Sequence, residues 1–215
     1  MTLPYISIAL LAGLLGAIPF GIIVTRILGR NNPREEGSGN IGATNVLRTS
    51  GWTTGLLTLA GDILKGLASV AIVPELLSSP SGSPYGEEIA ATAAVLGHMY
   101  SPFIGFQGGK GVATGLGVFA LMMPGPTAGA VIVFTATVVT TKYVSLGSIL
   151  GVLTVPLLGF LLDYPSKSKT AAALISILII WKHHSNIGRL IHGKENRFGS
   201  SLEKSSQQDI TFRYK

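Results

Sequence analysis

The chain has 215 residues, a mean hydropathy of +0.50 and only 12% charged residues, which excludes an ordinary water-soluble domain and indicates a protein that folds in lipid. It has no cysteine, so disulfides, thiolate nucleophiles and cysteine-ligated metal sites are excluded. Its formal charge of +6 comes without a basic stripe interleaved with aromatic residues, which argues against nucleic acid as a partner.

Three apolar stretches, residues 5–28, 52–77 and 144–162, are each close to the roughly 20 residues that an α-helix needs to cross a bilayer. The first is too long for the core of a signal peptide and has no basic region before it, so we interpret it as a retained span. Two shorter stretches, residues 127–139 and 170–181, can also span if lysine and aromatic side chains anchor their ends at the interface.

Two further apolar stretches, residues 89–100 and 112–123, are short for spans and flank a polar, glycine-rich segment at 101–111. Irregular backbone at membrane depth is tolerated only where protein buries it or where it lines a wet cavity, so this segment indicates a site. We therefore predict an all-α integral membrane protein with about seven transmembrane helices, some of them short or half-helical. Residues 1–199 are expected to form a single transmembrane domain, and residues 200–215 a polar cytoplasmic tail.

Lysine and arginine are distributed unevenly between the loops. If residues 30–49 lie in the cytoplasm, nearly all basic residues outside the spans share that side, with Lys167 and Lys169 as the exceptions. The positive-inside rule then predicts an outside N-terminus and a cytoplasmic C-terminus. Three polar segments, at residues 36–48, 107–114 and 182–199, meet on the cytoplasmic face in this arrangement. The outer side receives four acidic residues: Glu75, Glu87, Glu88 and Asp163.

The first polar segment contains a run, GSGNIGATN at residues 37–45, that alternates glycine with short hydroxyl and amide side chains. Such a loop can wrap an anion, because glycine accepts positive φ and exposes backbone N–H groups, while Ser38, Thr44 and Asn45 add side-chain donors. The alternative is a flexible turn whose residues cap a following helix. The pattern alone does not separate these two interpretations.

The second segment, QGGKGVAT at residues 107–114, places Lys110 among three glycines directly before an apolar helix. A helix N-terminus supplies partial positive charge and free N–H groups, and the lysine adds a full charge, so the pattern favours phosphate binding. The spacing is not that of a Walker A loop, and no strand precedes it. The alternative is an ordinary lysine that extends its charged end to the lipid interface.

The third segment, KHHSNIGRLIHGKE at residues 182–195, puts His183, Asn186 and Leu190 on one face if it is helical. A histidine and an amide would then point the same way. The alternative is a basic juxtamembrane segment attracted to anionic lipid headgroups. Zinc binding by the three histidines here lacks a fitting carboxylate or cysteine pattern, and we predict no metal site.

Charged residues also occur within and beside the spans. Asp62 and Lys65 lie one helical turn apart inside an apolar stretch, where charge is costly. We predict that they pair with each other or with polar loops, and that their role is structural rather than catalytic. Arg48 instead closes the first polar segment near the interface. A guanidinium there can hold phosphate through two parallel hydrogen bonds.

Together the three segments resemble the bacterial acyl-phosphate:glycerol-3-phosphate acyltransferases, the PlsY family, over almost the whole chain. The family's GSGNxGATN loop, GGKG phosphate loop and KHxxNIxRLxxGxE segment are all present in that order. The resemblance implies catalytic roles for four residues: His183, Lys110, Asn186 and Arg48. It implies substrate binding by a larger set: Ser38, Gly39, Asn40, Thr44, Asn45, Gly108, Gly109, Gly111, Arg189 and Glu195. It implies no cofactor.

The activity that the resemblance implies is attack by the sn-1 hydroxyl of glycerol 3-phosphate on acyl phosphate, which releases lysophosphatidate and inorganic phosphate. This is the first acylation of bacterial phospholipid synthesis, in the inner membrane, with a monomer as a sufficient unit. The residues agree, since no Ser-His-Asp or Cys-His grouping points to an acyl-enzyme. The base is either His183 or a substrate phosphate, and we favour the phosphate.

Two alternatives come from other classes of protein. A transporter or channel for phosphate or a phosphorylated metabolite also uses glycine-rich loops and half-helices, but predicts polar residues that continue to the outer face. A structural membrane protein with lipid-binding basic loops leaves the Gly-Ser-Asn-Thr pattern unexplained. The clustering of polar segments at one face favours the acyltransferase.

Overall fold

The computed structural model describes residues 3–77 and 83–199, and every regular element in these ranges is a helix. This confirms the all-α prediction for the described part of the chain, and the predicted tail at 200–215 lies outside it. The helices, in chain order, are α1 (Leu3–Ala17), α2 (Phe20–Ile27), α3 (Ala43–Ser50), α4 (Trp52–Ala71), α5 (Val73–Leu77), α6 (Gly86–Met99), the 3-10 helix η1 (Pro102–Ile104), α7 (Val112–Met122), α8 (Pro124–Thr141), α9 (Val144–Leu161), α10 (Ser166–Lys182) and α11 (His184–Ile191).

Four helical segments of the described chain are long and apolar enough to cross a membrane: Leu3–Ile27, Trp52–Leu77, Pro124–Thr141 and Val144–Leu161. Three of them match the predicted long spans. The fourth exceeds the predicted 127–139, because Pro124 starts the helix earlier and threonines continue it to its end. The other predicted stretches form α6, α7 and α10, and α10 extends beyond the predicted 170–181 at both ends.

The span predicted at residues 5–28 consists of two helices. Pro19 separates α1 from α2, because proline has no N–H to donate and its ring clashes with the preceding turn. Carbonyls at the break need other donors in an apolar environment. Ser101 Oγ donates to the Ala17 carbonyl at 2.6 Å, and Lys65 Nζ donates to the Ile18 carbonyl at 2.7 Å.

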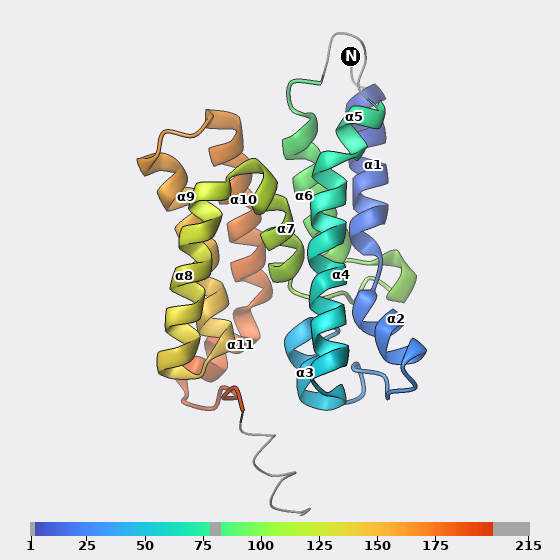
Figure 1. Cartoon of the computed structure of the whole chain (residues 1–215), viewed down its shortest axis with the longest axis vertical. Coiled ribbons are helices and arrows are strands. Elements are labelled where there is room, and N and C mark those ends of the chain that lie inside the picture. The colour runs from blue at the N-terminus through green and yellow to red at the C-terminus, as the bar shows by residue number, and fades with distance from the viewer. Residues whose placement is uncertain (1–2, 78–82, 200–215) are drawn as a thin grey trace, which may run out of the picture.

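The helices form two groups joined through α7 and through the packing of α10 on α6 (Figure 1). In one group α1, α4 and α6 pack together, and in the other α8 packs on α9, with α10 against both α9 and α6. Close packing of α7 on α4 requires Gly117, since a Cβ there would overlap the Ile63 carbonyl oxygen. The largest apolar core lies where α6, α7, α9 and α10 meet, around Val95, Val118 and Ile175.

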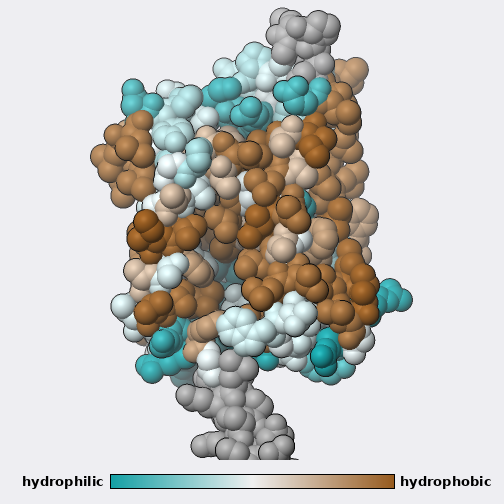
Figure 2. All heavy atoms as spheres, viewed as in Figure 1, coloured by the Kyte–Doolittle hydropathy of each residue, from teal (hydrophilic) through white to brown (hydrophobic). Residues whose placement is uncertain are grey.

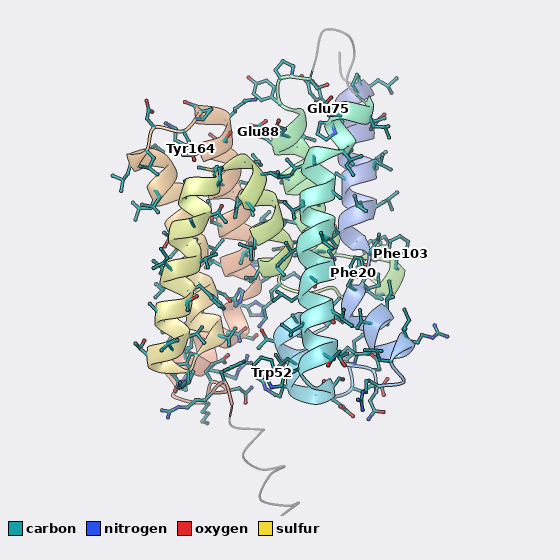
Figure 3. The ribbon with its side chains drawn as sticks, in the orientation of Figure 1. Phe20, Trp52, Glu75, Glu88, Phe103 and Tyr164 are labelled. Atoms are coloured by element: carbon teal, nitrogen blue, oxygen red, sulfur yellow. The ribbon has the colours of Figure 1, made fainter. Side chains whose placement is uncertain are left out.

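The surface matches a membrane environment. On the viewed face, apolar side chains form a broad belt across the middle of the molecule, and polar side chains gather at both ends (Figure 2). Many large hydrophobic side chains are exposed in this belt, including Leu64 at 61% and Phe160 at 66% of their surface. Trp52 lies at the end that carries α2, α3 and α11, whereas Glu75 and Glu88 lie at the opposite end (Figure 3).

Candidate active site

The three polar segments singled out in the sequence meet at the end of the molecule that carries α3 and α11. They surround a cavity of about 490 Å³. Most of the predicted site residues line it: Ser38, Asn40, Thr44, Asn45, Arg48, Lys110, Gly111, His183, Asn186, Arg189 and Glu195. Three predicted residues, Gly39, Gly108 and Gly109, are not part of this lining.

The loop before α3 is shaped by Asn45, which is almost fully buried. Its side-chain oxygen accepts a hydrogen bond from the Ser38 N–H at 2.8 Å, and its amide donates to the carbonyls of Pro33 and Asn40, both at 2.9 Å. These bonds are internal to the loop, so Asn45 holds its curvature. The hydroxyls of Ser38 and Thr44 have no hydrogen-bond partner in the described chain, which leaves them available to a ligand.

Arg48 lies in the last turn of α3 and points into the cavity without a hydrogen bond or ion pair to any described residue. Burial lowers the pKa of its guanidinium. The positive charge of Arg189 lowers this pKa further, whereas the Glu195 carboxylate raises it. An arginine remains charged throughout the physiological range. Its five donors are thus free for an anion.

The glycine loop before α7 contains Gly108 and Gly109, for which the resemblance implies substrate binding. The Gly108 N–H donates to the Met99 carbonyl at 3.2 Å and the Gly109 N–H to the His98 carbonyl at 3.1 Å, so both are used within the fold. Gly111 takes a left-handed conformation, with φ of 84°, and caps α7. The first N–H groups of α7 have no intrahelical acceptor, and they bring the positive end of its dipole to the cavity.

Lys110 belongs to a hydrogen-bond network that joins α7, α9 and α11. Its ammonium donates to the Asn186 side-chain oxygen, and the Asn186 amide donates to Glu195 Oε1 at 2.7 Å. Glu195 also accepts from Ser145 Oγ at 2.8 Å and from Arg189 Nε at 2.7 Å. Burial alone would raise the pKa of Glu195, but these hydrogen bonds outweigh it and lower the pKa, which keeps the carboxylate ionised.

Ser145 was missed in the sequence. Its only signal was a hydroxyl residue at the start of a predicted span, where a serine usually interacts with the backbone of its own helix end. Here its hydroxyl reaches Glu195, 50 residues further along the chain.

Two groups in the site have strongly altered acidity. Burial lowers the pKa of Lys110 to about 8; the charge of Glu195 opposes the shift and those of Arg189 and Arg48 reinforce it. Burial also lowers the pKa of His183 to about 4. His183 Nδ1 lies 2.7 Å from the Ile179 carbonyl, which can only accept, so Nδ1 carries the proton and Nε2 remains an acceptor.

His183 and Asn186 both line the cavity, as expected from their shared face, whereas Leu190 does not. His183 caps the end of α10 and α11 begins one residue later. The other two histidines of the segment, His184 and His192, are exposed and bond to the backbone carbonyls of Trp181 and Gly188. No cluster of side chains suited to a metal occurs among the described residues.

The segment after Glu195 crosses the mouth of the cavity. The Phe198 N–H donates to the Lys142 carbonyl at 2.7 Å, and the Phe198 ring packs edge-on against Trp52 with ring centroids 6.1 Å apart. Lys142 ends α8, and Trp52 begins α4. This segment therefore bridges the two helix groups.

Away from its polar mouth, the cavity continues as an apolar groove between α4, α7, α8 and α9. Leu59, Leu116, Phe134 and Val152 line it, one from each helix. Figure 2 shows the viewed face hollowed between the α8 side and the α4 side. Leu56 is 53% exposed and Val131 44%, so parts of the groove wall face outward toward the apolar belt.

The predicted pair of Asp62 and Lys65 is confirmed, with Lys65 Nζ 2.8 Å from Asp62 Oδ1. The sequence did not predict a third member, His98, whose Nδ1 lies 3.5 Å from the same carboxylate oxygen. Asp62 and His98 also line the cavity, deeper than the cations at the mouth.

Comparison with known proteins gives consistent matches. The family model described as glycerol-3-phosphate acyltransferase matches residues 6–193. Curated proteins of that description include one from Syntrophotalea carbinolica, 44% identical over 92% of this chain and 99% of its own length. Another, from Trichlorobacter lovleyi, is 46% identical over 87% of this chain and 94% of its own.

Two solved structures share the fold. Both are crystal structures of PlsY, described as an integral membrane glycerol 3-phosphate acyltransferase. The glycerol 3-phosphate form matches with a TM-score of 0.83 and 38% identity, covering 93% of this chain and 97% of the other. The lysophosphatidic acid form matches with a TM-score of 0.81 and 37% identity, covering 91% and 96%.

Proposed function

The chain belongs to the glycerol-3-phosphate acyltransferase family, the PlsY family, and on this premise we propose that it transfers a fatty acyl group from acyl phosphate to the sn-1 hydroxyl of glycerol 3-phosphate. The hydroxyl oxygen forms an ester bond with the carbonyl carbon, and the bond between that carbon and the phosphate oxygen breaks. The hydroxyl proton is taken up by phosphate. The products are lysophosphatidate and inorganic phosphate.

One observation carries the proposal: cations at the polar mouth of a cavity adjoin an apolar groove in the same cavity. Two phosphate-bearing substrates need two cationic contacts, and Lys110 and Arg48 provide them from different segments. The acyl chain of the donor needs an apolar surface that continues from one phosphate site. The groove between α4, α7, α8 and α9 supplies that surface.

Lys110 is the contact for the donor phosphate in this proposal. It combines a full charge with the N-terminus of α7, an arrangement that favours phosphate. Asn186 fixes the ammonium on one side, and Glu195 fixes Asn186 in turn. Acyl phosphate is already activated, so holding it in line with the hydroxyl and neutralising its charge supply most of the catalysis.

Arg48 is the contact for the phosphate of glycerol 3-phosphate. Its guanidinium can hold two phosphate oxygens at once, and the free hydroxyls of Ser38 and Thr44 add neutral donors. Glu195 remains paired with Arg189, which keeps the carboxylate from competing with phosphate for Arg48.

The proton of the attacking hydroxyl passes to a substrate phosphate in this mechanism. A pKa of about 4 makes His183 a weak base at neutral pH, whereas a phosphate monoester has a second pKa of about 6. His183→Gln keeps a polar group but cannot take a proton near neutrality. We expect this variant to retain substantial kcat and to bind substrate more weakly. A loss of kcat by about 10² to 10⁴ with unchanged KM would instead identify His183 as the base.

We place the active site on the cytoplasmic face of the bacterial inner membrane, with the N-terminus outside and the C-terminus inside. The residues 1–199 then act as one multi-pass domain, and one copy of the chain supplies the whole cavity lining. Because the chain lacks cysteine, single cysteines at positions 37 and 83 can be probed with impermeant reagents on intact cells. Labelling of position 83 only is expected, and labelling of position 37 from outside would invert the orientation.

The donor is tested directly with purified enzyme in detergent. Acyl phosphate with radiolabelled glycerol 3-phosphate should give labelled lysophosphatidate and inorganic phosphate. Acyl-CoA and acyl carrier protein, offered in place of acyl phosphate, should give none. Turnover with acyl-CoA alone would overturn the proposed donor, and binding without any lysophosphatidate would favour a transporter.

A further inference from the structure

Three ionisable side chains lie in the interior of the helix bundle and have no part in the mechanism above. Asp62, Lys65 and His98 are each only 2–3% exposed. Removing charged and polar groups from water is costly, and replacing a buried ion pair by well-packed apolar side chains is often neutral or stabilising. Stability alone is therefore a weak reason for such a cluster.

The cluster is anchored at one edge to the break in the first span. Lys65 Nζ donates to the Ile18 carbonyl at 2.7 Å and lies 2.8 Å from Asp62 Oδ1. Asp62 in turn faces His98, with 3.5 Å between the carboxylate oxygen and Nδ1. These contacts tie the break after α1 to α4 and place the imidazole beside the Asp62 carboxylate, although His98 Nδ1 makes no hydrogen bond within the described chain.

The other edge of the cluster touches the glycine loop before α7. A Cβ built on Gly109 would overlap Nε2 of His98, and the next two atoms it would approach also belong to the imidazole. The Gly109 N–H donates to the His98 carbonyl at 3.1 Å. The residue that follows is Lys110. The imidazole therefore packs directly beneath the backbone that carries the phosphate-binding ammonium.

We propose that His98, packed between the Asp62–Lys65 pair and the glycine loop, is a positioning residue for Lys110. Through its contact with Gly109, the imidazole sets how far the glycine loop stands from α6, and hence where the ammonium meets the donor phosphate. This inference rests on the proposed function of Lys110. It assigns His98 an effect on donor binding, without contact to the reacting atoms.

The test is a suppressor comparison at two neighbouring glycines. Gly109→Ala should displace the loop, because the new methyl overlaps the His98 ring, and His98→Ala should make room for it. Gly108→Ala is the matched control: its methyl would overlap the backbone carbonyl of His98, which no side-chain change removes. Each glycine variant is made alone and with His98→Ala, and KM for acyl phosphate, KM for glycerol 3-phosphate and kcat are measured.

We expect His98→Ala alone to raise KM for acyl phosphate about five- to tenfold, with KM for glycerol 3-phosphate changed less than about twofold. In the Gly109→Ala background, adding His98→Ala should lower the donor KM again by at least several-fold. In the Gly108→Ala background it should give no recovery. If His98→Ala does not fold, His98→Asn, which is also smaller than histidine, takes its place.

Equal effects on both KM values, or equal behaviour in the two glycine backgrounds, would overturn the positioning role and leave only a packing role.

Titration of each variant with inorganic phosphate provides a second readout that needs no turnover. Failure of the wild-type enzyme with acyl phosphate would contradict the proposed donor. Unchanged phosphate affinity in His98→Ala and His98→Asn would contradict this inference alone.

Discussion

The two polar ends of the molecule differ in whether their charged side chains have oppositely charged partners. At the end that carries Glu88, the carboxylate lies 3.6 Å from Lys167 Nζ and accepts a hydrogen bond from Ser168 at 3.1 Å. At the cavity end, Lys110 bonds to a neutral amide and Arg48 has no anionic partner in the described chain. Uncompensated positive charge in a partly buried cavity is costly unless a ligand anion completes it. The difference between the ends therefore supports the proposal that phosphate binds at the cavity end.

The largest effect should come from Lys110→Ala, which removes a charge that nothing else in the cavity replaces. We expect kcat/KM for acyl phosphate to fall by about 10² to 10³, the range seen when a donor that stabilises transition-state charge is lost. Lys167→Ala at the opposite end is the matched control and should stay within about twofold of wild type, since Lys167 lies outside the cavity lining and its side chain is partly exposed. Near-normal kinetics for Lys110→Ala would remove the basis for the donor site.

Arg48→Ala should have the next largest effect, and it should act on the other substrate. Loss of hydrogen bonds to a charged group costs about 1.5 to 3 kcal/mol, so KM for glycerol 3-phosphate should rise about 10- to 100-fold. Arg48→Lys should recover only part of this, because lysine cannot make two parallel hydrogen bonds. A rise confined to the KM for acyl phosphate would reverse the assignment of the two cations.

The pH dependence of donor binding should sharpen the comparison further. With a pKa of about 8, Lys110 is charged below that pH and loses its charge above it. The kcat/KM for acyl phosphate, which reports the free enzyme, should therefore decline as pH rises above about 8. Lys110→Arg keeps its charge at all accessible pH and should abolish this alkaline decline, even if its rate is lower. A decline that persists in Lys110→Arg would belong to another group.

The smallest effect should come from the hydroxyls. Ser38→Ala removes one neutral donor from the first loop and should raise KM for glycerol 3-phosphate about five- to tenfold. Ser168→Ala removes a hydroxyl that, unlike that of Ser38, already donates a hydrogen bond within the protein, to Glu88. It should lower stability by about 1 kcal/mol in thermal unfolding and leave both KM values unchanged. Similar kinetic losses in the two variants would indicate a general loss of folded enzyme.

Much of this arrangement could be predicted from the sequence, because the patterns involved are local. Apolar length predicted the long spans, and the spacing of Asp62 and Lys65 predicted their pairing. The convergence of three polar segments followed from topology, and the cavity that Arg48, Lys110 and Asn186 share agrees with it.

The features that could not be predicted depend on distant partners. Pro19 was visible, but whether a proline kinks or ends a helix in lipid depends on which side chains reach the freed carbonyls. The glycines at 108 and 109 looked like an open phosphate cradle, yet α6 uses their N–H groups. His98 lay in an apolar stretch with no local signal, and only its contacts with Asp62 and Gly109 set it apart.

The break in the first span also has a consequence for how the protein is made. The carbonyls of Ile18 and Ala17 are served by side chains 47 and 84 residues further along the chain. Neither donor exists while the ribosome is still completing the first hydrophobic segment. The Ile18 carbonyl also accepts from the Phe20 N–H at 3.1 Å, but the Ala17 carbonyl must find another partner, such as water at the translocon, until Ser101 is in place. The final hydrogen bonds of the break form only after α4 and the loop beyond α6 are in place, which makes its completion a late, long-range event.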